Sequence, residues 1–453
     1  MTSIRVPPGP KSRIPGKILF SLQRDRLAFV TRLASYGDIA YFTLGSERIY
    51  FLSRPEWIAD VLVTHSRKFR KGPGLEVTKH LLGEGLLASE GDFHLRQRRL
   101  AQPAFHRQRV AAYASTMSSY ARRLSDSWKP GELRNIHEDM MGLTLAIVGK
   151  TLFDADVESD ASEIGEALTV AITMFDRLVI PYAKLLNYIP GSGMGAFRRA
   201  KDRLDTIIYR MIAEHRQGPD RGDLLSMLLL ARDTEEAAPS GAIGEFGDSM
   251  SDLQVRNEAM TILLAGHETV ANALTWTWYL LSSHPEIEAQ LHREVDTQLD
   301  GRLPGESDWP KLRYTYAVLA ESMRLYPPAW ATGRRALESI EIGGYTIPAE
   351  AVVIMSQYTM HRDARYFPDP ERFDPSRWLQ PMDVPKFAYF PFGGGPHLCI
   401  GEGFAWMEGV LALATLAQRW KLRLDPRYKV GFEPKITLRP AKGMPMSLER
   451  RGV

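Results

Sequence analysis

The sequence has 453 residues, of which 44% are hydrophobic, enough for one large domain or for two or three ordinary ones. Its net charge of +3 gives no case for nucleic acid as a partner. A single cysteine excludes an internal disulfide framework and an iron–sulfur cluster held by the chain's own cysteines, and it indicates a cytoplasmic protein.

The N-terminal part of the chain has no strong pattern. Residues 1–24 lack a charged region followed by a long apolar run, so we expect neither a signal peptide nor a membrane anchor. Proline and glycine fill positions 7–10, which favours an extended segment without packing of its own. We therefore predict an irregular lead-in over residues 1–29.

A small sheet should follow. Residues 38–44 and 48–53 are β-rich runs separated by a short turn that contains Gly45, which predicts a hairpin. Pro55 then begins a helical period that continues to Val63. From residue 71 to 91 glycine is frequent and the periodicity is weak, which predicts a loop.

The next segment is basic. Residues 91–99 contain His94 and Arg98, which are four apart and so share one face of a helix. Together they could neutralise an anion. A solvated basic face is the commoner explanation for the arginines that cluster here, so the residues alone leave both interpretations open.

The middle of the chain is helical in pattern. Residues 136–153 and 199–215 predict helices, with a less regular stretch at 167–189 between them. Residues 221–231 predict another apolar helix, and residues 233–250, rich in Gly, Ala and Glu, predict a surface loop.

The longest expected helix comes next. Ser251 or Asp252 can cap its start, and nothing stops the pattern before Pro285, so a helix of about 30 residues would run roughly 45 Å and cross a whole domain. Its most apolar part contains His267 and Glu268, which argues against a membrane span.

The middle of this helix carries an unusual glycine. Gly266 costs about 1 kcal/mol relative to alanine in a helix, so it should serve either the close approach of a ligand or packing against another helix. Thr269 can bond the carbonyl of Ala265, either to widen the turn for a water molecule or merely to satisfy itself. We expect His267 to face away.

Further along, charged and β-type segments alternate. Glu321 and Arg324 are three apart on a helix that ends before Pro327, which predicts a structural ion pair. Runs at 331–335, 340–347 and 351–357 are β-type.

The chain's only cysteine, Cys399, lies in the stretch FPFGGGPHLCIG at residues 390–401. Glycines 393–395 permit backbone conformations closed to other residues and let a flat ligand approach the main chain. A helix pattern over residues 401–420 places Cys399 at a helix N-terminus, where N–H groups and the dipole stabilise a thiolate, a strong ligand for iron. The alternative is an ordinary turn with a small buried thiol.

This stretch resembles the cysteine-ligand loop of the cytochromes P-450, the haem-thiolate monooxygenases. The residues that carry the resemblance are Phe392, Gly395, His397, Cys399 and Gly401. It implies that Cys399 holds the haem iron, that Phe392 packs beside the sulfur, and that the glycines, Gly393 and Gly401 among them, give access. His397 would bond a haem propionate, where many members have arginine.

Other segments resemble further motifs of this family. By that resemblance His94, Arg98 and Arg334 hold the propionates, although Arg335 could be confused with Arg334. The segment 265–269 resembles the oxygen-binding motif, in which Ala265 and Gly266 lie against the haem while Glu268 and Thr269 relay protons to dioxygen. Glu321, Arg324 and Arg372 resemble a structural Glu-Arg-Arg network. The resemblance places at the substrate Ala265, Ala331, Thr332, Thr437 and Leu438.

The resemblance implies a mostly α (α+β) fold, a single domain over residues 1–453 in which helices surround heme b beside a small sheet region. The expected reaction inserts one oxygen atom of O2 into an apolar small molecule, by hydroxylation or epoxidation of a fatty acid, terpenoid, steroid or polyketide. Electrons would come from a ferredoxin or flavodoxin with its reductase. The family suggests a soluble bacterial protein, expected to be a monomer.

Two alternatives remain at this point. One is a peroxide-driven or isomerising haem-thiolate enzyme, against which the intact pair of Glu268 and Thr269 argues. The other is a non-catalytic haem protein that serves as a gas sensor or electron carrier.

Overall fold

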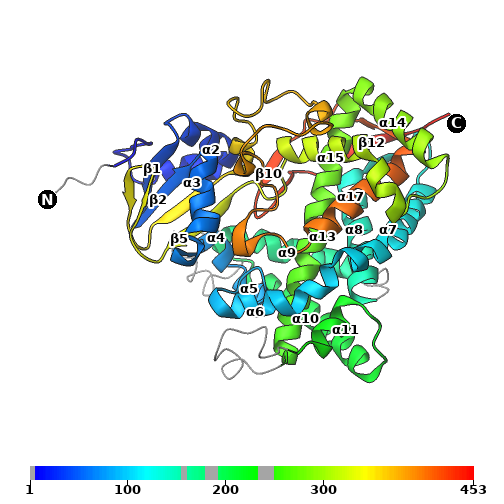
Figure 1. Ribbon diagram of the computed structural model, residues 1–453, viewed down its shortest axis with the longest axis horizontal. Coiled ribbons are helices and arrows are strands. Elements are labelled where there is room, and N and C mark those ends of the chain that lie inside the picture. Colours follow the sequence, from blue (N-terminus) through cyan, green and yellow to red (C-terminus); the bar gives the residue numbers. More distant parts are fainter. Residues whose placement is uncertain (1–5, 155–160, 179–191, 233–248, 453) are drawn as a thin grey trace.

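The structure, a computed structural model, describes residues 6–154, 161–178, 192–232 and 249–452. Helices make up most of the chain, and the largest sheet lies at one end of the molecule, beside the N-terminus (Figure 1). The mostly α fold with a small sheet region is therefore confirmed.

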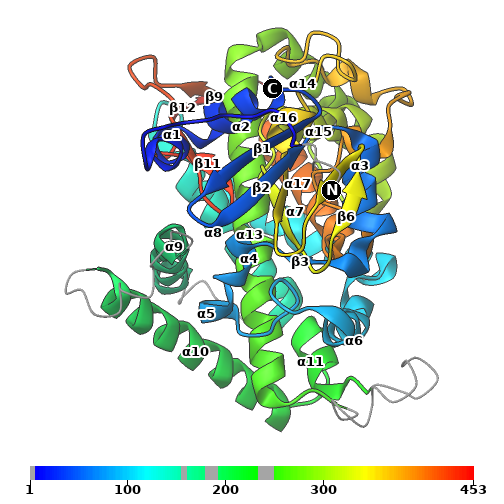
Figure 2. The ribbon, with the colours of Figure 1, turned by 90° about the vertical axis from the view of Figure 1, so that its left-hand side faces the viewer.

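Helix α13 (Asp252–Ser283) runs through the whole molecule (Figure 2). It starts where the sequence predicts, because the side chain of Ser251 accepts a hydrogen bond from the backbone of Gln254 and the Gln254 side chain bonds back to Ser251. Most of its side chains are buried, since other helices surround it. These neighbours include α8 (Ile136–Phe153), α10 (Met194–Gln217), α15 (Arg313–Leu325) and α17 (Glu402–Ala417).

The helical layer is completed by further helices of different lengths. They include α1 (Lys17–Arg24), α2 (Arg26–Ala34), α3 (Pro55–Ala59), α4 (Pro73–Glu76), α5 (Lys79–Leu82), α6 (Gly91–Ala101), α7 (Arg107–Ser127), α9 (Ala161–Leu178), α11 (Leu224–Leu230), α14 (Pro285–Leu299) and α16 (Gln357–Met360). Helix α6 presents the predicted basic segment, and α8, α10 and α11 match the predicted helices.

The largest sheet has five strands in the order β1-β2-β8-β5-β3. The strands are β1 (Ile39–Leu44), β2 (Glu47–Leu52), β3 (Phe69–Lys71), β5 (Thr332–Ala336) and β8 (Val352–Met355). Strands β1 and β2 form the predicted antiparallel hairpin, whereas β2 pairs with β8 in parallel. The register of β3 against β5 sets Lys71 opposite Arg334, which brings two cationic residues together at the sheet edge.

Smaller sheets use the C-terminal part of the chain. They consist of β6 (Ile340–Ile342) with β7 (Tyr345–Ile347), of β4 (Leu133–Asn135) and β9 (Trp420–Leu424) on either side of β12 (Pro445–Arg450), and of β10 (Phe432–Pro434) with β11 (Leu438–Pro440). The turn between β10 and β11 contains Ile436 and Thr437, and β11 contacts α13.

The irregular lead-in over residues 1–29 is wrong from residue 17 onward. Helices α1 and α2 occupy this region, and the side chain of Asp25 caps α2 by accepting from the backbone of Ala28. Helix α2 buries Phe29 and Val30 against the sheet, so burial of an apolar face overrides the weak local pattern. The loop expected at residues 71–91 likewise contains the two short helices α4 and α5.

Two further expectations need adjustment. The stretch 167–189 is a regular helix as far as Leu178, the end of α9, and its remainder lies outside the described residues, as does most of the loop at 233–250. The helix expected over 401–420 ends at Ala417, and Trp420 begins β9 instead. Within the described ranges, no helix combines the length and apolar character that crossing a membrane requires.

Candidate functional site

A cavity of about 670 Å³ lies between α13, strand β5, the β10–β11 turn and residues 390–401, which we call the cysteine loop. Most of its wall is apolar, and its polar groups come from these four elements and from others such as α6 and β3. The cavity-lining residues that the sequence predicts are His94, Arg98, Ala265, Gly266, Glu268, Thr269, Ala331, Thr332, Arg334, Phe392, Gly393, His397, Cys399, Gly401 and Thr437. Segments far apart in the sequence therefore meet at one place.

The cysteine loop is shaped by its glycines. Gly395 has φ +67°, and a side chain there would overlap the carbonyl oxygen of Leu62, so only glycine fits. The backbone N–H of Cys399 donates to the carbonyl of Phe392 at 3.0 Å, which closes the loop. The Phe392 ring lies 5.5 Å from the ring of Trp406 on α17. The loop thus presents Cys399 in one fixed place.

The accessible surface of Cys399 faces the cavity, while the protein around it is dense. Burial raises the pKa of the thiol to about 11, opposed by the N–H of Gly401 and the charge of Arg98. The stabilisation of a thiolate that we expect from the helix N-terminus is present, but burial outweighs it when no metal is bound. A coordinated metal ion reverses this balance, because it deprotonates a thiol outright.

A cluster of basic side chains lines the cavity beside the cysteine loop. Arg98 on α6 donates to the carbonyl of Leu398 at 2.5 Å. The rings of His94 and His397 lie 4.2 Å apart, and His94 Nε2 is 3.3 Å from the carbonyl of Pro396. Burial lowers the pKa of both histidines, that of His94 to about 4, so both are neutral at pH 7 and offer hydrogen bonds rather than charge.

The two neighbouring arginines of β5 point in different directions. Arg334 lines the cavity, and the hydrogen bond of its side chain goes to the adjacent carbonyl of Gly333 at 3.0 Å. Arg335 turns away and pairs with Glu47 at 2.9 Å. Strand alternation explains the difference, because successive side chains leave opposite faces. The structure therefore favours Arg334 over Arg335 as the cavity residue.

The middle of α13 forms one wall of the cavity. The Thr269 hydroxyl donates to the carbonyl of Ala265 at 2.8 Å, as we expect. A side chain at Gly266 would press on Val148 of α8, so this glycine serves helix packing as well as lining the cavity. His267 is fully buried and bonds the carbonyl of Leu263, away from the cavity.

Glu268 is buried and bonds a residue from the other side of the cavity. Its Oε1 accepts from the hydroxyl of Thr437, in the β10–β11 turn, at 2.6 Å. Its Oε2 has no partner among the described residues. Burial raises the pKa of this carboxyl, opposed by Thr437 and by the charges of Arg439 and Lys435. A raised pKa suits a group that must carry a proton.

One expected pocket residue does not reach the cavity. Leu438 is fully buried outside the cavity wall; its backbone N–H donates to the carbonyl of Pro328, and its own carbonyl accepts from Trp276. The preceding residues Ile436 and Thr437 line the cavity instead. Leu438 belongs to strand β11, so its alternation points it into the core.

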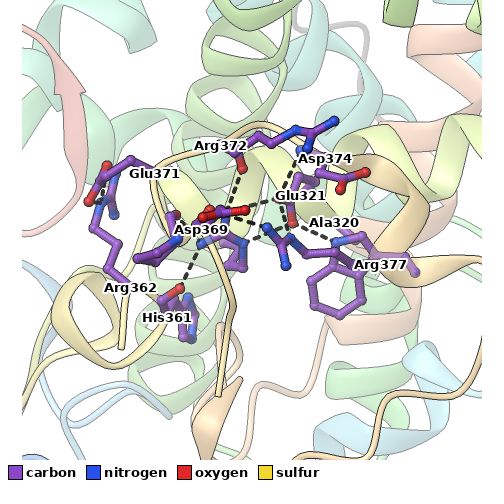
Figure 3. A network of polar contacts seen from close by, with 12 residues as sticks. Ala320, Glu321, His361, Arg362, Asp369, Glu371, Arg372, Asp374 and Arg377 are labelled. Carbon is purple, nitrogen blue, oxygen red and sulfur yellow. Dashed lines mark hydrogen bonds and ion pairs between the residues drawn. The ribbon is translucent and has the colours of Figure 1, made fainter. Parts of the chain in front are cut away.

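The expected network of Glu321, Arg324 and Arg372 exists in altered form (Figure 3). Glu321 and Arg324 are both fully buried and share two hydrogen bonds of 2.8 and 2.9 Å. Arg372 contributes its carbonyl, which accepts from Arg324, while its side chain is exposed. Arg377 is the second arginine, 3.3 Å from Glu321. Including the Arg372 side chain in the network is wrong.

Comparison with known proteins agrees with this geometry. A family model, cytochrome P450, matches residues 7–444. The chain belongs to the cytochrome P450 family. Cyclooctatin synthase of Streptomyces melanosporofaciens is 39% identical, over 92% of this chain and 90% of that protein. Cyclooctat-9-en-7-ol 5-monooxygenase of the same organism is 38% identical over 90% and 87%, and pentalenene oxygenase of Streptomyces avermitilis is 32% identical over 90% and 89%.

Membership of the cytochrome P450 family implies a haem, and the residues of the cavity fit one. The Cys399 thiol faces the cavity, as an iron ligand must. Near it, Arg334 is buried, and among the described residues no carboxylate lies within ion-pair distance of its side chain. Nδ1 of His397 is buried without a partner in the part of the chain that the structure describes. Arg334 therefore has no carboxylate paired with it and Nδ1 of His397 has no hydrogen-bond partner among the described residues, and haem propionates supply two anionic acceptors.

The cytochrome P450 site also contains Lys71, which sequence reasoning missed. Its ammonium is buried, lines the cavity and donates to the carbonyls of Leu86 and Ser89 at 3.0 and 2.6 Å. Burial lowers its pKa to about 7, opposed by Glu90. No local pattern marks a lysine at the end of a three-residue strand as functional, because its importance comes from facing Arg334 across β3 and β5.

Proposed function

We propose that this cytochrome P450 oxidises a terpenoid, by hydroxylation or epoxidation of an apolar carbon skeleton. The observation that carries the proposal is that Cys399, Glu268 and Thr269 open onto the same largely apolar cavity. The names of the related cyclooctat-9-en-7-ol 5-monooxygenase and pentalenene oxygenase support a terpenoid as the substrate class. Other apolar molecules that the sequence leaves open, such as fatty acids, have no such support.

The cofactor that we propose is heme b, held through Cys399. A haem bound covalently in the c-type manner needs a Cys-x-x-Cys-His motif, which a chain with one cysteine cannot provide. Arg98, Arg334, His94 and His397 would hold the propionates, and Phe392 would pack beside the sulfur. When bound, the haem supplies the activation of dioxygen.

The chain's own residues have three tasks in this reaction. The apolar walls of the cavity exclude water and orient the substrate. Glu268 holds a proton in a buried carboxyl, and the Thr269 hydroxyl lies one residue further along the same helix wall. Cleavage of dioxygen to water consumes two protons, which a carboxyl group and a hydroxyl can deliver inside a dry pocket. Ala331 and Thr332 contact the substrate from β5 and the segment before it.

We further propose that electrons come from a ferredoxin or flavodoxin with its reductase. The family match occupies residues 7–444, so this stretch is taken up by the cytochrome P450 family itself. Binding of a small electron carrier would have to occur on the surface outside the cavity.

The test is a titration of the purified haem-loaded protein with two sets of compounds, terpene hydrocarbons and alcohols in one and fatty acids of matched size in the other. We expect terpenoids to displace water from the iron and shift its spin state, and turnover with a ferredoxin and its reductase to give oxygenated terpenoid. A spin shift and products with fatty acids alone would overturn the proposed substrate class.

A further inference from the structure

The carboxyl of Glu268 is held asymmetrically. The side chain is 1% exposed, and its Oε1 accepts from Thr437 at 2.6 Å. Its Oε2 has no partner among the residues that the structure describes, although Glu268 lines the cavity. One oxygen is therefore anchored, and the other is buried without a partner among the described residues.

The anchor continues as a hydrogen-bonded chain to another helix. The Thr437 oxygen accepts from Nδ2 of Asn272 at 3.2 Å, and Oδ1 of Asn272 lies 3.1 Å from Nε2 of His137 on α8. An amide N–H can only donate, so the single hydroxyl hydrogen of Thr437 is directed to Glu268. Burial lowers the pKa of His137 to about 4, so the ring is neutral, and its Nε2–H tautomer completes the chain.

This polarity determines where the carboxyl proton sits. Because Oε1 of Glu268 already receives a hydrogen from Thr437, a proton on the carboxyl belongs on Oε2. Oε2 is the oxygen without a partner in the described structure, on a side chain that lines the cavity. The hydrogen bonds from Asn272 to Thr437 and from Thr437 to Glu268 thus make the two carboxyl oxygens inequivalent and leave the proton on Oε2.

The turn that carries Thr437 is fixed from several sides. The backbone N–H of Leu438 donates to the carbonyl of Pro328 at 2.9 Å, and the carbonyl of Leu438 accepts from Trp276 of α13 at 3.0 Å. Trp330 donates to the carbonyl of Lys435 at 2.7 Å. Such bonds hold the Thr437 hydroxyl in place without help from a ligand.

We propose that Thr437 is a positioning residue for Glu268: the Thr437 hydroxyl anchors Oε1 of the carboxyl, so that the proton of the carboxyl is held on Oε2. This inference rests on the proposed function, in which Glu268 delivers protons. It assigns the β10–β11 turn a part in proton delivery in addition to its place in the cavity wall.

The charged groups around Glu268 belong to the same turn and its strands. Arg439 and Lys435 lower the pKa of the carboxyl, whereas Glu433 raises it. Glu433 pairs with both cations, at 2.7 Å to Arg439 and 2.9 Å to Lys435, so it offsets one of the two positive charges. His267 and His137 are buried and neutral. The Thr437 hydroxyl is therefore the specific polar contact of the carboxylate.

The test compares Thr437→Val, which keeps the shape and removes the hydroxyl, with Thr437→Ser, which keeps the hydroxyl. The matched control is Thr275→Val, which removes another buried hydroxyl of the same region, one that bonds the carbonyl of Ala271 within α13. For each haem-loaded variant, product and peroxide formed per electron consumed are measured from pH 5.5 to about 9, a range chosen around the usual working pH of proton-transfer groups.

Losing a hydrogen bond to the charged form raises a carboxyl pKa, so the alkaline limb of the Thr437→Val profile should move up by about one pH unit or more. Its peroxide yield should rise several-fold, because the carboxyl is no longer anchored and its proton is no longer held on one oxygen. Thr437→Ser should restore both, and Thr275→Val should change neither. An unshifted limb with normal coupling in Thr437→Val would overturn the proposal.

A second readout needs no substrate. A carboxyl whose pKa is higher in the folded than in the unfolded chain costs stability as the pH rises through the folded value. Thr437→Val raises this pKa further, so its loss of stability in urea unfolding should be larger at pH 8 than at pH 5, and Glu268→Gln should abolish the difference. A loss independent of pH would refute the contact's role, even if no terpenoid proved to be a substrate.

Discussion

The altered Glu321 network gives a sharp prediction about which arginine supports the fold. Arg324 is completely buried; it bonds both oxygens of Glu321 and the carbonyls of His361, Pro370 and Arg372 at 2.7–3.0 Å. Removing one partner of a buried ion pair costs about 3–5 kcal/mol, because the other charge stays buried without compensation. Arg324→Met should therefore be the most destabilising of the arginine replacements here.

Glu321 has further hydrogen-bond partners besides Arg324, and these determine how much stability the replacement of the other arginines should cost. Without Arg324, the carboxylate still accepts from the indole of Trp378 at 2.8 Å and from Arg377. Arg377 makes one contact of 3.3 Å to Glu321 and one of 3.2 Å to a carbonyl, so Arg377→Met should cost about 1.5–3 kcal/mol, the range for a hydrogen bond to a charged group. Arg372→Ala removes only an exposed side chain and should stay within about 0.5 kcal/mol of the parent.

The assay is urea unfolding of the haem-loaded variants, followed by tryptophan fluorescence and by the haem absorbance. A chain of this size with a bound cofactor does not unfold in two states, so the order of the midpoints is the observable. We expect Arg324→Met lowest, Arg377→Met intermediate, and Arg372→Ala equal to the parent. If Arg372→Ala lowers the midpoint as much as Arg377→Met, the assignment of the second arginine to Arg377 is wrong.

Three further predictions concern the cavity. Cys399→Ser should abolish the red-shifted carbon monoxide band of the reduced protein, and an unchanged spectrum would exclude Cys399 as the iron ligand. Arg334→Leu should lower the fraction of haem retained on gel filtration, whereas Arg335→Leu should not, because Arg335 does not line the cavity and already pairs with Glu47; equal losses would contradict the separation of the two arginines. Thr269→Ala should divert electrons from product to peroxide several-fold, measured as peroxide per electron consumed, and unaltered coupling would count against a role in proton delivery.

The parts of the structure that the sequence predicts well depend on short-range rules. Ser251 starts α13 because a serine followed by glutamine three residues later forms a capping box. The glycines of the cysteine loop are needed for local backbone geometry, so their spacing is informative without the rest of the fold. The hairpin of β1 and β2 is another local feature, since its turn is visible in the residues at 45–47.

The missed features depend on contacts between distant segments. Arg372 and Arg377 belong to one loop, and nothing in their spacing shows which of them turns inward to Glu321. Thr437 lies 169 residues from Glu268, so the hydrogen bond between them is invisible in the sequence. Lys71 becomes part of the cavity only through the pairing of β3 with β5. In each case the sequence shows the type of residue but does not show which way its side chain points in the folded protein.

Two buried arginines, Arg324 and Arg334, show how the surroundings of a side chain distinguish a residue that stabilises the fold from one that binds a ligand. Arg324 is enclosed by a carboxylate and by carbonyls of its own chain, so its charge is compensated and it needs no ligand. Arg334 is equally removed from bulk water, yet its side chain bonds the adjacent carbonyl, and Lys71 lies beside it. Burial lowers the pKa of Arg334 to about 10 and the charge of Glu90 opposes this only in part, so the buried charge is disfavoured. Burying uncompensated positive charge costs stability, and binding of an anionic cofactor can restore it. The cluster of Arg334 and Lys71 therefore fits an anionic ligand, whereas the surroundings of Arg324 do not.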